Sequence, residues 1–168
     1  MSEMEYPKFS VLMSLYLKEK PEYLNEALKS VINQTVKPNE IVIVYDGPIT
    51  TELKSVVEQY VSNNPGLIKI IDNPENKGLG LALADGVPQC TYELIARMDT
   101  DDICRKDRFE KQLEEFVKDP RLDICGSHIL EFEEKEENIV ARRRVPLVDK
   151  DIKEYQKRRD GFNHVSVM

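Results

Sequence analysis

Residues 40–48 read EIVIVYDGP, and this stretch decides the class of fold. The run from Glu40 to Tyr45 is nearly continuous in apolar, β-branched residues, which is typical of a parallel strand buried on both faces. Asp46 follows at the end of the strand, and Gly47-Pro48 then forces a turn. A carboxylate in this place can accept a hydrogen bond from the ring N–H of a nucleotide base. A turn-forming aspartate is an equally common explanation.

The same strand-then-helix unit recurs on both sides of this stretch. Further strand-like runs cover residues 9–16, 67–71 and 93–98. Each of the four runs is followed by apolar residues at helical spacing, as after the first run with Leu24, Ala27, Leu28, Val31 and Ile32. Four such units in succession predict an α/β fold, with a mainly parallel sheet and helices on both of its faces.

The pattern changes in the last third of the chain. Two strand-like pieces, residues 127–132 and 139–145, flank a charged tip at 133–138, which predicts an antiparallel addition near the C-terminus. Without internal repeats or a Gly/Ser-rich linker, residues 6–168 are expected to form a single domain. The terminal stretch 162–168, FNHVSVM, is apolar and β-like, so we expect the chain to be the N-terminal part of a longer protein.

Composition excludes several classes of protein. The chain has 24 Lys+Arg and 31 Asp+Glu, a formal charge of −7, which disfavours a general affinity for nucleic acid or anionic membrane. Its cysteines, Cys90, Cys104 and Cys125, lack any metal-ligand or disulfide-framework spacing, so we expect free thiols in a reducing cytosol. The apolar run near the N-terminus is too short for a membrane span or a signal sequence.

The strongest chemical signal is Asp99-Thr100-Asp101-Asp102, which directly follows the fourth predicted strand. In open α/β sheets the ligand lies beyond the carboxyl ends of the strands. Residues two apart in extended chain point the same way, so Asp99 and Asp101 can face one ligand together. A hard divalent cation, Mg²⁺ or Mn²⁺, relieves their repulsion and bridges to phosphate oxygens. The alternative is a solvated acidic turn that caps the helix beginning near Asp107.

Asn76-Lys77-Gly78 offers a cation and backbone amides before a predicted helix, both suited to an anionic ligand, although Asn-x-Gly is also a common turn. Gly78-Leu79-Gly80 lacks the third glycine of a dinucleotide-binding loop and follows the third strand instead of the first. The chain contains no P-loop lysine pattern. His128 and His164 lack a nucleophile motif, which leaves hydrolase triads unsupported. Arg142-Arg143-Arg144 is best explained as a solvated face.

In their order along the chain, these segments resemble family 2 glycosyltransferases, and the match covers nearly the whole chain. The closest resemblance is to bacterial exopolysaccharide transferases of the amylovoran-biosynthesis type. The segments that carry it are FSVLMSLYLKEKPEYLNEALKSVINQT, EIVIVYDGP, NKGLGLALADGV and ARMDTDDICRKDRFEKQ. The resemblance implies the Rossmann-like GT-A fold of nucleotide-diphospho-sugar transferases.

The resemblance also implies roles for particular residues. Tyr16 would lie against the nucleotide base and Asp46 would hydrogen-bond it, with Lys77 assisting near the base or phosphates. Asp99 would contact the ribose and Asp101 would bind the metal ion, while Asp102 completes the acidic motif. One departure is Leu17, where many members have Asn, and this puts the contacts of the first loop in doubt.

The implied function is metal-dependent, inverting transfer of a sugar from a nucleotide-diphosphate sugar, with a UDP-sugar as the expected donor, to a polysaccharide or lipid-linked acceptor. In the family, the catalytic base lies C-terminal of the position that matches Met168, so this fragment is expected to bind donor and to transfer sugar poorly. The alternatives are a nucleotidyltransferase and a non-catalytic nucleotide-binding module. The expected location is the cytoplasm, with peripheral association at the inner face of the cell membrane as a further possibility for the full-length protein.

Overall fold

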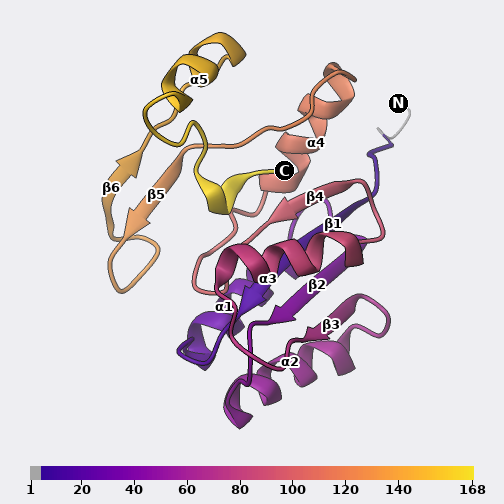
Figure 1. Cartoon of the computed structure of the whole chain (residues 1–168). Coiled ribbons are helices and arrows are strands. Elements are labelled where there is room, and N and C mark those ends of the chain that lie inside the picture. The colour runs from indigo at the N-terminus through magenta and orange to yellow at the C-terminus, as the bar shows by residue number, and fades with distance from the viewer. Residues whose placement is uncertain (1–4) are drawn as a thin grey trace.

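A four-stranded parallel sheet forms the centre of the fold (Figure 1). The computed structural model describes residues 5–168. Its strands and helices alternate along the chain up to residue 118 and confirm the predicted α/β pattern. In chain order these elements are β1 Phe9–Leu15, α1 Pro21–Ile32, β2 Glu40–Tyr45, α2 Thr51–Asn63, β3 Ile68–Asp72, α3 Leu79–Gly86, β4 Leu94–Arg97 and α4 Arg108–Lys118.

The strand order is β3-β2-β1-β4, so the chain runs outward from β1 to one side and then returns to its other side. Every residue of β1 is buried, because this strand has a neighbour on each edge and helices over each face. The order reverses between β1 and β4, and in open α/β sheets such a reversal opens a crevice at the carboxyl ends of the strands. This topology therefore fixes where a ligand can enter the sheet.

The two faces of the sheet have separate apolar clusters. Alternate residues of a strand point to opposite faces. Thus Val11 and Met13 of β1 pack with α1, α2 and α4, whereas Leu12 packs with Ala82 of α3. Figure 1 shows α3 lying in front of the sheet, with α1 and α2 behind it. Helices therefore cover both faces, as the buried strand pattern predicted.

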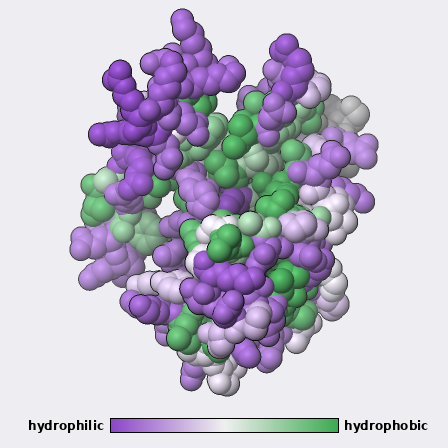
Figure 2. Space-filling view, in the orientation of Figure 1, coloured by the Kyte–Doolittle hydropathy of each residue, from purple (hydrophilic) through white to green (hydrophobic). Residues whose placement is uncertain are grey.

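The predicted antiparallel addition is a hairpin of β5, Ile129–Phe132, and β6, Ile139–Arg143. It is followed by α5, Asp149–Gln156, a helix that the sequence analysis did not anticipate. None of the residues of α5 is buried, and this region is strongly hydrophilic in Figure 2. A helix without a buried apolar stripe leaves little periodic signal in the sequence.

The expectation of β-like structure at the end of the chain is wrong for residues 164–166. His164–Ser166 form a short 3-10 helix. Only the last two residues bond as a strand would: the N–H of Arg97 donates to the carbonyl of Val167 (2.9 Å), and Met168 exchanges two hydrogen bonds with Cys125 (2.9 and 3.0 Å). The C-terminal segment is thereby fixed beside β4 and close to the candidate site.

The three cysteines are free thiols, as their spacing predicted. Desolvation raises the pKa of Cys90 and of Cys125 to about 11, so both stay protonated at neutral pH. Among residues 5–168, no helix has the length and apolar character needed to cross a bilayer.

Phe109 of α4 is a test of the main core, because its ring is fully buried and packs edge-on against Phe9 at a centroid distance of 5.0 Å. We expect Phe109→Ala to lower the free energy of unfolding by about 3–5 kcal/mol in urea titrations. Val117 lies on the same helix and is 43% exposed. Val117→Ala is therefore the matched control, with an expected loss below about 1 kcal/mol. Equal losses for both variants would contradict this assignment of the core.

Candidate functional site

A cavity of about 460 Å³ opens at the carboxyl edge of the sheet. Its lining comes from the segments that follow all four strands, where the sequence had placed the candidate ligand-binding residues. The topology brings Tyr16, Asp46, Asp99 and Asp101 to this one cavity. The complete lining is Ser14, Tyr16, Glu19, Asp46, Asn76, Gly78, Leu79, Asp99, Thr100 and Asp101.

Asp46 is nearly fully buried and organises the loop after β3. Its two carboxylate oxygens accept hydrogen bonds from the backbone N–H groups of Lys77 (2.7 Å) and Gly78 (3.0 Å). The side chain of Asn76 donates to the backbone carbonyl of Asp46 (3.0 Å). Each carboxylate oxygen keeps a second lone pair, so Asp46 retains the capacity to accept from a ligand. Its contact with a base stays a prediction.

Gly47 allows these two loops to approach closely. Its φ is +82°, a left-handed conformation that side chains rarely adopt, and a Cβ built on it would lie 2.5 Å from the backbone nitrogen of Asn76. The Asp-Gly pair and the Asn-Lys-Gly loop therefore form one packed unit beside the cavity.

The side chain of Lys77 points to α3. Its amine forms an ion pair with Asp85 (3.0 Å), which also accepts from the side chain of Asn73 (3.1 Å). Lys77 is absent from the cavity lining, and its backbone N–H bonds Asp46 instead. A role of the Lys77 amine near a base or phosphate stays a prediction, and it requires the amine to leave Asp85.

Three carboxylates form an acidic cluster, Asp99, Asp101 and Asp102. Each offers one oxygen, and these three atoms lie within 4.8 Å of one another. Desolvation, with Glu19 and Asp99 adding to it, raises the pKa of Asp101. Desolvation, followed by Asp101 and Asp99, raises the pKa of Asp102 to about 6. Closely spaced carboxylates repel one another, and a hard divalent cation such as Mg²⁺ or Mn²⁺ would relieve this repulsion by binding their oxygens.

Thr100 ties the acidic cluster to the loop after β1. It is buried, and its hydroxyl donates to a carboxylate oxygen of Glu19 (2.6 Å). Asp99, Thr100 and Asp101 all line the cavity, as does Glu19. Glu19 is a site residue that the sequence analysis missed, although it lies one residue beyond the loop 14–18 that follows the first strand.

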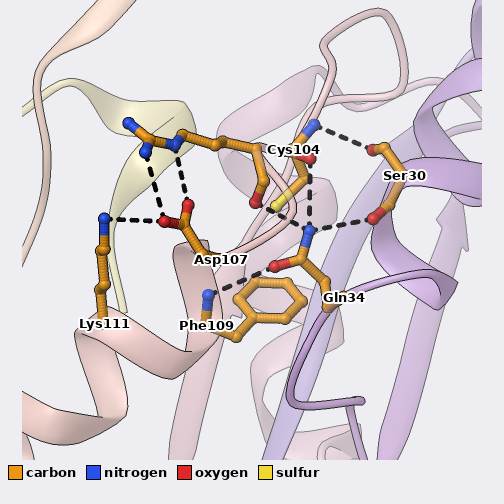
Figure 3. Close-up of polar contacts among 7 residues, drawn as sticks. Ser30, Gln34, Cys104, Asp107, Phe109 and Lys111 are labelled. Atoms are coloured by element: carbon orange, nitrogen blue, oxygen red, sulfur yellow. Dashed lines mark hydrogen bonds and ion pairs between the residues drawn. The ribbon is translucent and has the colours of Figure 1, made fainter.

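The loop after the acidic cluster is anchored to α1. Figure 3 shows the buried amide of Gln34 between Ser30 and the backbone of residues 104–109. Its nitrogen donates to the carbonyls of Cys104 (3.2 Å) and Arg105 (2.9 Å), and its oxygen accepts from the N–H of Phe109 (3.3 Å). The hydroxyl of Ser30 accepts from the N–H of Cys104 (2.9 Å). These bonds fix the path of the chain directly after the cluster.

The acidic cluster does not cap α4, which was the alternative explanation of its sequence. This helix begins at Arg108, and its N-cap residue is Asp107. The carboxylate of Asp107 pairs with Arg105 (2.8 Å) and Lys111 (2.7 Å). Residues 99–102 are too far along the chain to satisfy the first turn of α4, so helix capping does not explain three adjacent carboxylates.

A parallel sheet with helices on both faces, a small antiparallel hairpin and an acidic cluster where the strand order reverses together define a GT-A glycosyltransferase fold. Residues 10–168 match the family model for glycosyl transferase family 2, and the chain belongs to this family.

Two relatives and one solved structure illustrate the similarity. The chain is 42% identical over 160 residues to the amylovoran biosynthesis glycosyltransferase AmsE of Erwinia amylovora, covering 95% of this chain and 59% of that protein. It is 40% identical over 164 residues to UDP-Gal:alpha-D-GlcNAc-diphosphoundecaprenol beta-1,3-galactosyltransferase of Escherichia coli, covering 96% and 58%. The chain thus spans less than two thirds of these relatives.

The mannosyltransferase PcManGT of Pyrobaculum calidifontis, solved with GDP-Man and Mn²⁺, has the same fold, with a TM-score of 0.63. The superposition covers 73% of this chain and 36% of that one, at 20% sequence identity. At this identity the likeness establishes the architecture, and the resemblance of the chain to GT-A enzymes is confirmed at the level of the fold.

Substitution of Gly47 tests the packing of the two loops. We expect Gly47→Ala to lower the free energy of unfolding by more than about 2 kcal/mol, because both the positive φ and the contact with Asn76 oppose a side chain. Gly66 has φ +79° with nothing within 4 Å of the added Cβ, so Gly66→Ala isolates the backbone cost of about 1 kcal/mol. Gly80, in α3 with open space around it, is the neutral control. Equal urea midpoints for Gly47→Ala and Gly66→Ala would contradict the close approach.

Proposed function

We propose that this chain is the donor-binding part of a glycosyltransferase, and that a nucleoside-diphosphate sugar occupies the cavity at the carboxyl edge of the sheet with a divalent cation on the acidic cluster. The observation that carries the proposal is the convergence of Asp99, Asp101 and Asp102, with oxygens within 4.8 Å of one another, beside a cavity of about 460 Å³. A cavity of that size is in the range of small-molecule sites. The family membership supplies the class of ligand.

Four of the residues that line the cavity have proposed roles in binding the donor or the cation. Tyr16 is 44% exposed at the rim, where its ring can stack on a base. Asp46 holds the loop 76–78 and accepts from the base. Asp99 accepts from the ribose hydroxyls, and Asp101 with Asp102 holds the cation. The donor is proposed to be a UDP-sugar, as the name of the E. coli relative indicates for that protein.

The proposed reaction is a direct displacement at the anomeric carbon with inversion. The cation, when bound, offsets the negative charge that develops on the departing nucleoside diphosphate. The residues of this chain hold the donor in one orientation, so that only one face of the sugar is open to attack. A carboxylate base must take the proton of the acceptor hydroxyl, and by family resemblance this base lies beyond the position of Met168.

The acceptor is proposed to be a polysaccharide or a lipid-linked saccharide. The E. coli relative carries a diphosphoundecaprenol-linked acceptor in its name, and the E. amylovora relative is named for the biosynthesis of an exopolysaccharide. An acceptor with a lipid anchor places the reaction at the cytoplasmic face of a membrane. The whole protein would then associate with that face from a cytoplasmic position.

Nucleotide titration separates this function from the alternatives. We expect UDP to bind more tightly than GDP, and to bind at least about tenfold more tightly with Mn²⁺ than without it, because the cation bridges the diphosphate to the cluster. Isothermal calorimetry measures both effects. A preference for UTP over UDP would favour nucleotidyl transfer, and absence of binding would leave a non-catalytic module.

Asp101 is the residue on which metal-dependent binding is expected to depend. We expect Asp101→Ala to abolish the Mn²⁺-dependent gain in UDP affinity. We expect it to change the free energy of unfolding by less than about 0.5 kcal/mol, because the side chain is exposed and forms no ion pair with a basic side chain among residues 5–168. Asp149→Ala, on exposed α5, is the matched control. Unchanged UDP affinity with Mn²⁺ in Asp101→Ala would remove Asp101 from the site.

A further inference from the structure

Arg97, the last residue of β4, is a buried arginine with unsatisfied hydrogen-bonding groups. Only 5% of its surface is exposed, and its Nε and Nη1 atoms have no hydrogen-bond partner among residues 5–168. Its register partner in β1 is Leu12, which packs on the α3 face, whereas Ala96 and Met98 belong to the cluster on the opposite face. Arg97 therefore lies on the α3 face of β4, two residues before the acidic cluster.

Within the described residues 5–168, Arg97 forms an ion pair with Asp99 alone, through its Nη2. Burying an arginine with open N–H groups is costly, and one ion pair seldom offsets that cost. Arg108 provides the contrast: it is half-buried, and its Nη2 donates to the carbonyls of Arg97 (2.9 Å) and Val167 (3.1 Å) and its Nε to Gln112 (2.9 Å). Arg108 is explained by these bonds, whereas Arg97 is not explained by hydrogen bonding.

The charges around Arg97 suggest its purpose. Its positive charge opposes the rise in the pKa of Asp101 and Asp102 that desolvation chiefly causes. His164 lies near the same group, and burial and Arg97 together lower the pKa of His164, which leaves this imidazole neutral at pH 7. Arg108 also lowers the pKa of Asp102, and Arg97 is the arginine that forms an ion pair with a member of the cluster.

We infer that Arg97 is an internal counter-cation that engages one carboxylate oxygen of Asp99 and thereby leaves Asp101 and Asp102 as the principal metal ligands. The ion pair with Asp99 reduces the formal charge of the cluster from −3 to −2. Metal binding by the free protein is thereby weakened, and the diphosphate of the donor supplies the missing negative charge. The inference rests on the proposed function and adds to it a positioning residue that couples the cation to the donor.

The test is the affinity of the protein for Mn²⁺ alone, measured by electron paramagnetic resonance without nucleotide. We expect Arg97→Met to bind Mn²⁺ about tenfold more tightly, because a third carboxylate becomes available and a positive charge is lost. Arg97→Lys keeps the charge and is expected to stay within about threefold of the wild type. A residue with a purely structural role would give the opposite result, with lower stability and unchanged or weaker Mn²⁺ binding.

Asp99 completes a double-mutant cycle. Asp99→Asn leaves Arg97 uncompensated and is expected to weaken Mn²⁺ binding about tenfold. The double variant Arg97→Met with Asp99→Asn removes both charges and is expected to return within about threefold of the wild type. This variant also keeps the test open if Arg97→Met alone does not fold, since it leaves no unpaired charge beside the sheet.

The outcomes separate this inference from the proposed function. Wild-type protein that binds no Mn²⁺ even in the presence of UDP overturns both. Wild-type protein that binds Mn²⁺ through Asp101, combined with an Arg97→Met variant that binds it no more tightly, overturns the role of Arg97 alone. A double variant that departs from the wild type by much more than threefold overturns it as well.

Discussion

Electrostatic repulsion among carboxylates at one edge of the sheet is the constraint on which the site depends. Three aspartates meet there because all of them lie in the short loop at the carboxyl end of β4, which the bond between Thr100 and Glu19 ties to the loop after β1. Loss of hydration makes the charged forms of Asp101 and Asp102 less favourable, as the raised pKa of each indicates. Such a cluster is stable where the fold holds the carboxylates in place and a cation can relieve their repulsion.

The fold meets this requirement with buried polar contacts on both sides of the cluster. Before the cluster, β4 is hydrogen-bonded to the fully buried β1. After it, Gln34 joins the outgoing loop to α1. Across the cavity, Asp46 fixes the backbone of residues 77–78 with two hydrogen bonds. These contacts pre-organise the cavity, because the loops that line it have few alternative conformations.

The sequence predicted the features that follow from strand burial and from the positions of strand ends. It did not predict the features that depend on the direction of individual side chains. The central strands were recognisable because a doubly buried parallel strand is continuously apolar. The cavity followed from the rule that ligands bind at carboxyl edges, which placed Asp46 and Asp101 together. In contrast, α5 carries no buried stripe, and neither the turn of Lys77 toward Asp85 nor the burial of Arg97 in an apolar strand has a periodic signature.

Arg97 also helps to explain how the three carboxylates can lie close together when no metal ion is bound. Three carboxylates without a counter-charge would either take up protons or spread apart, and both changes would disturb the cavity between donor-binding events. The positive charge of Arg97 in β4 offsets part of the negative charge of the cluster, because it pairs with Asp99 at the edge of the cavity. The cost of burying Arg97 is then a cost of pre-organisation, offset by the charge that the diphosphate and its cation bring together.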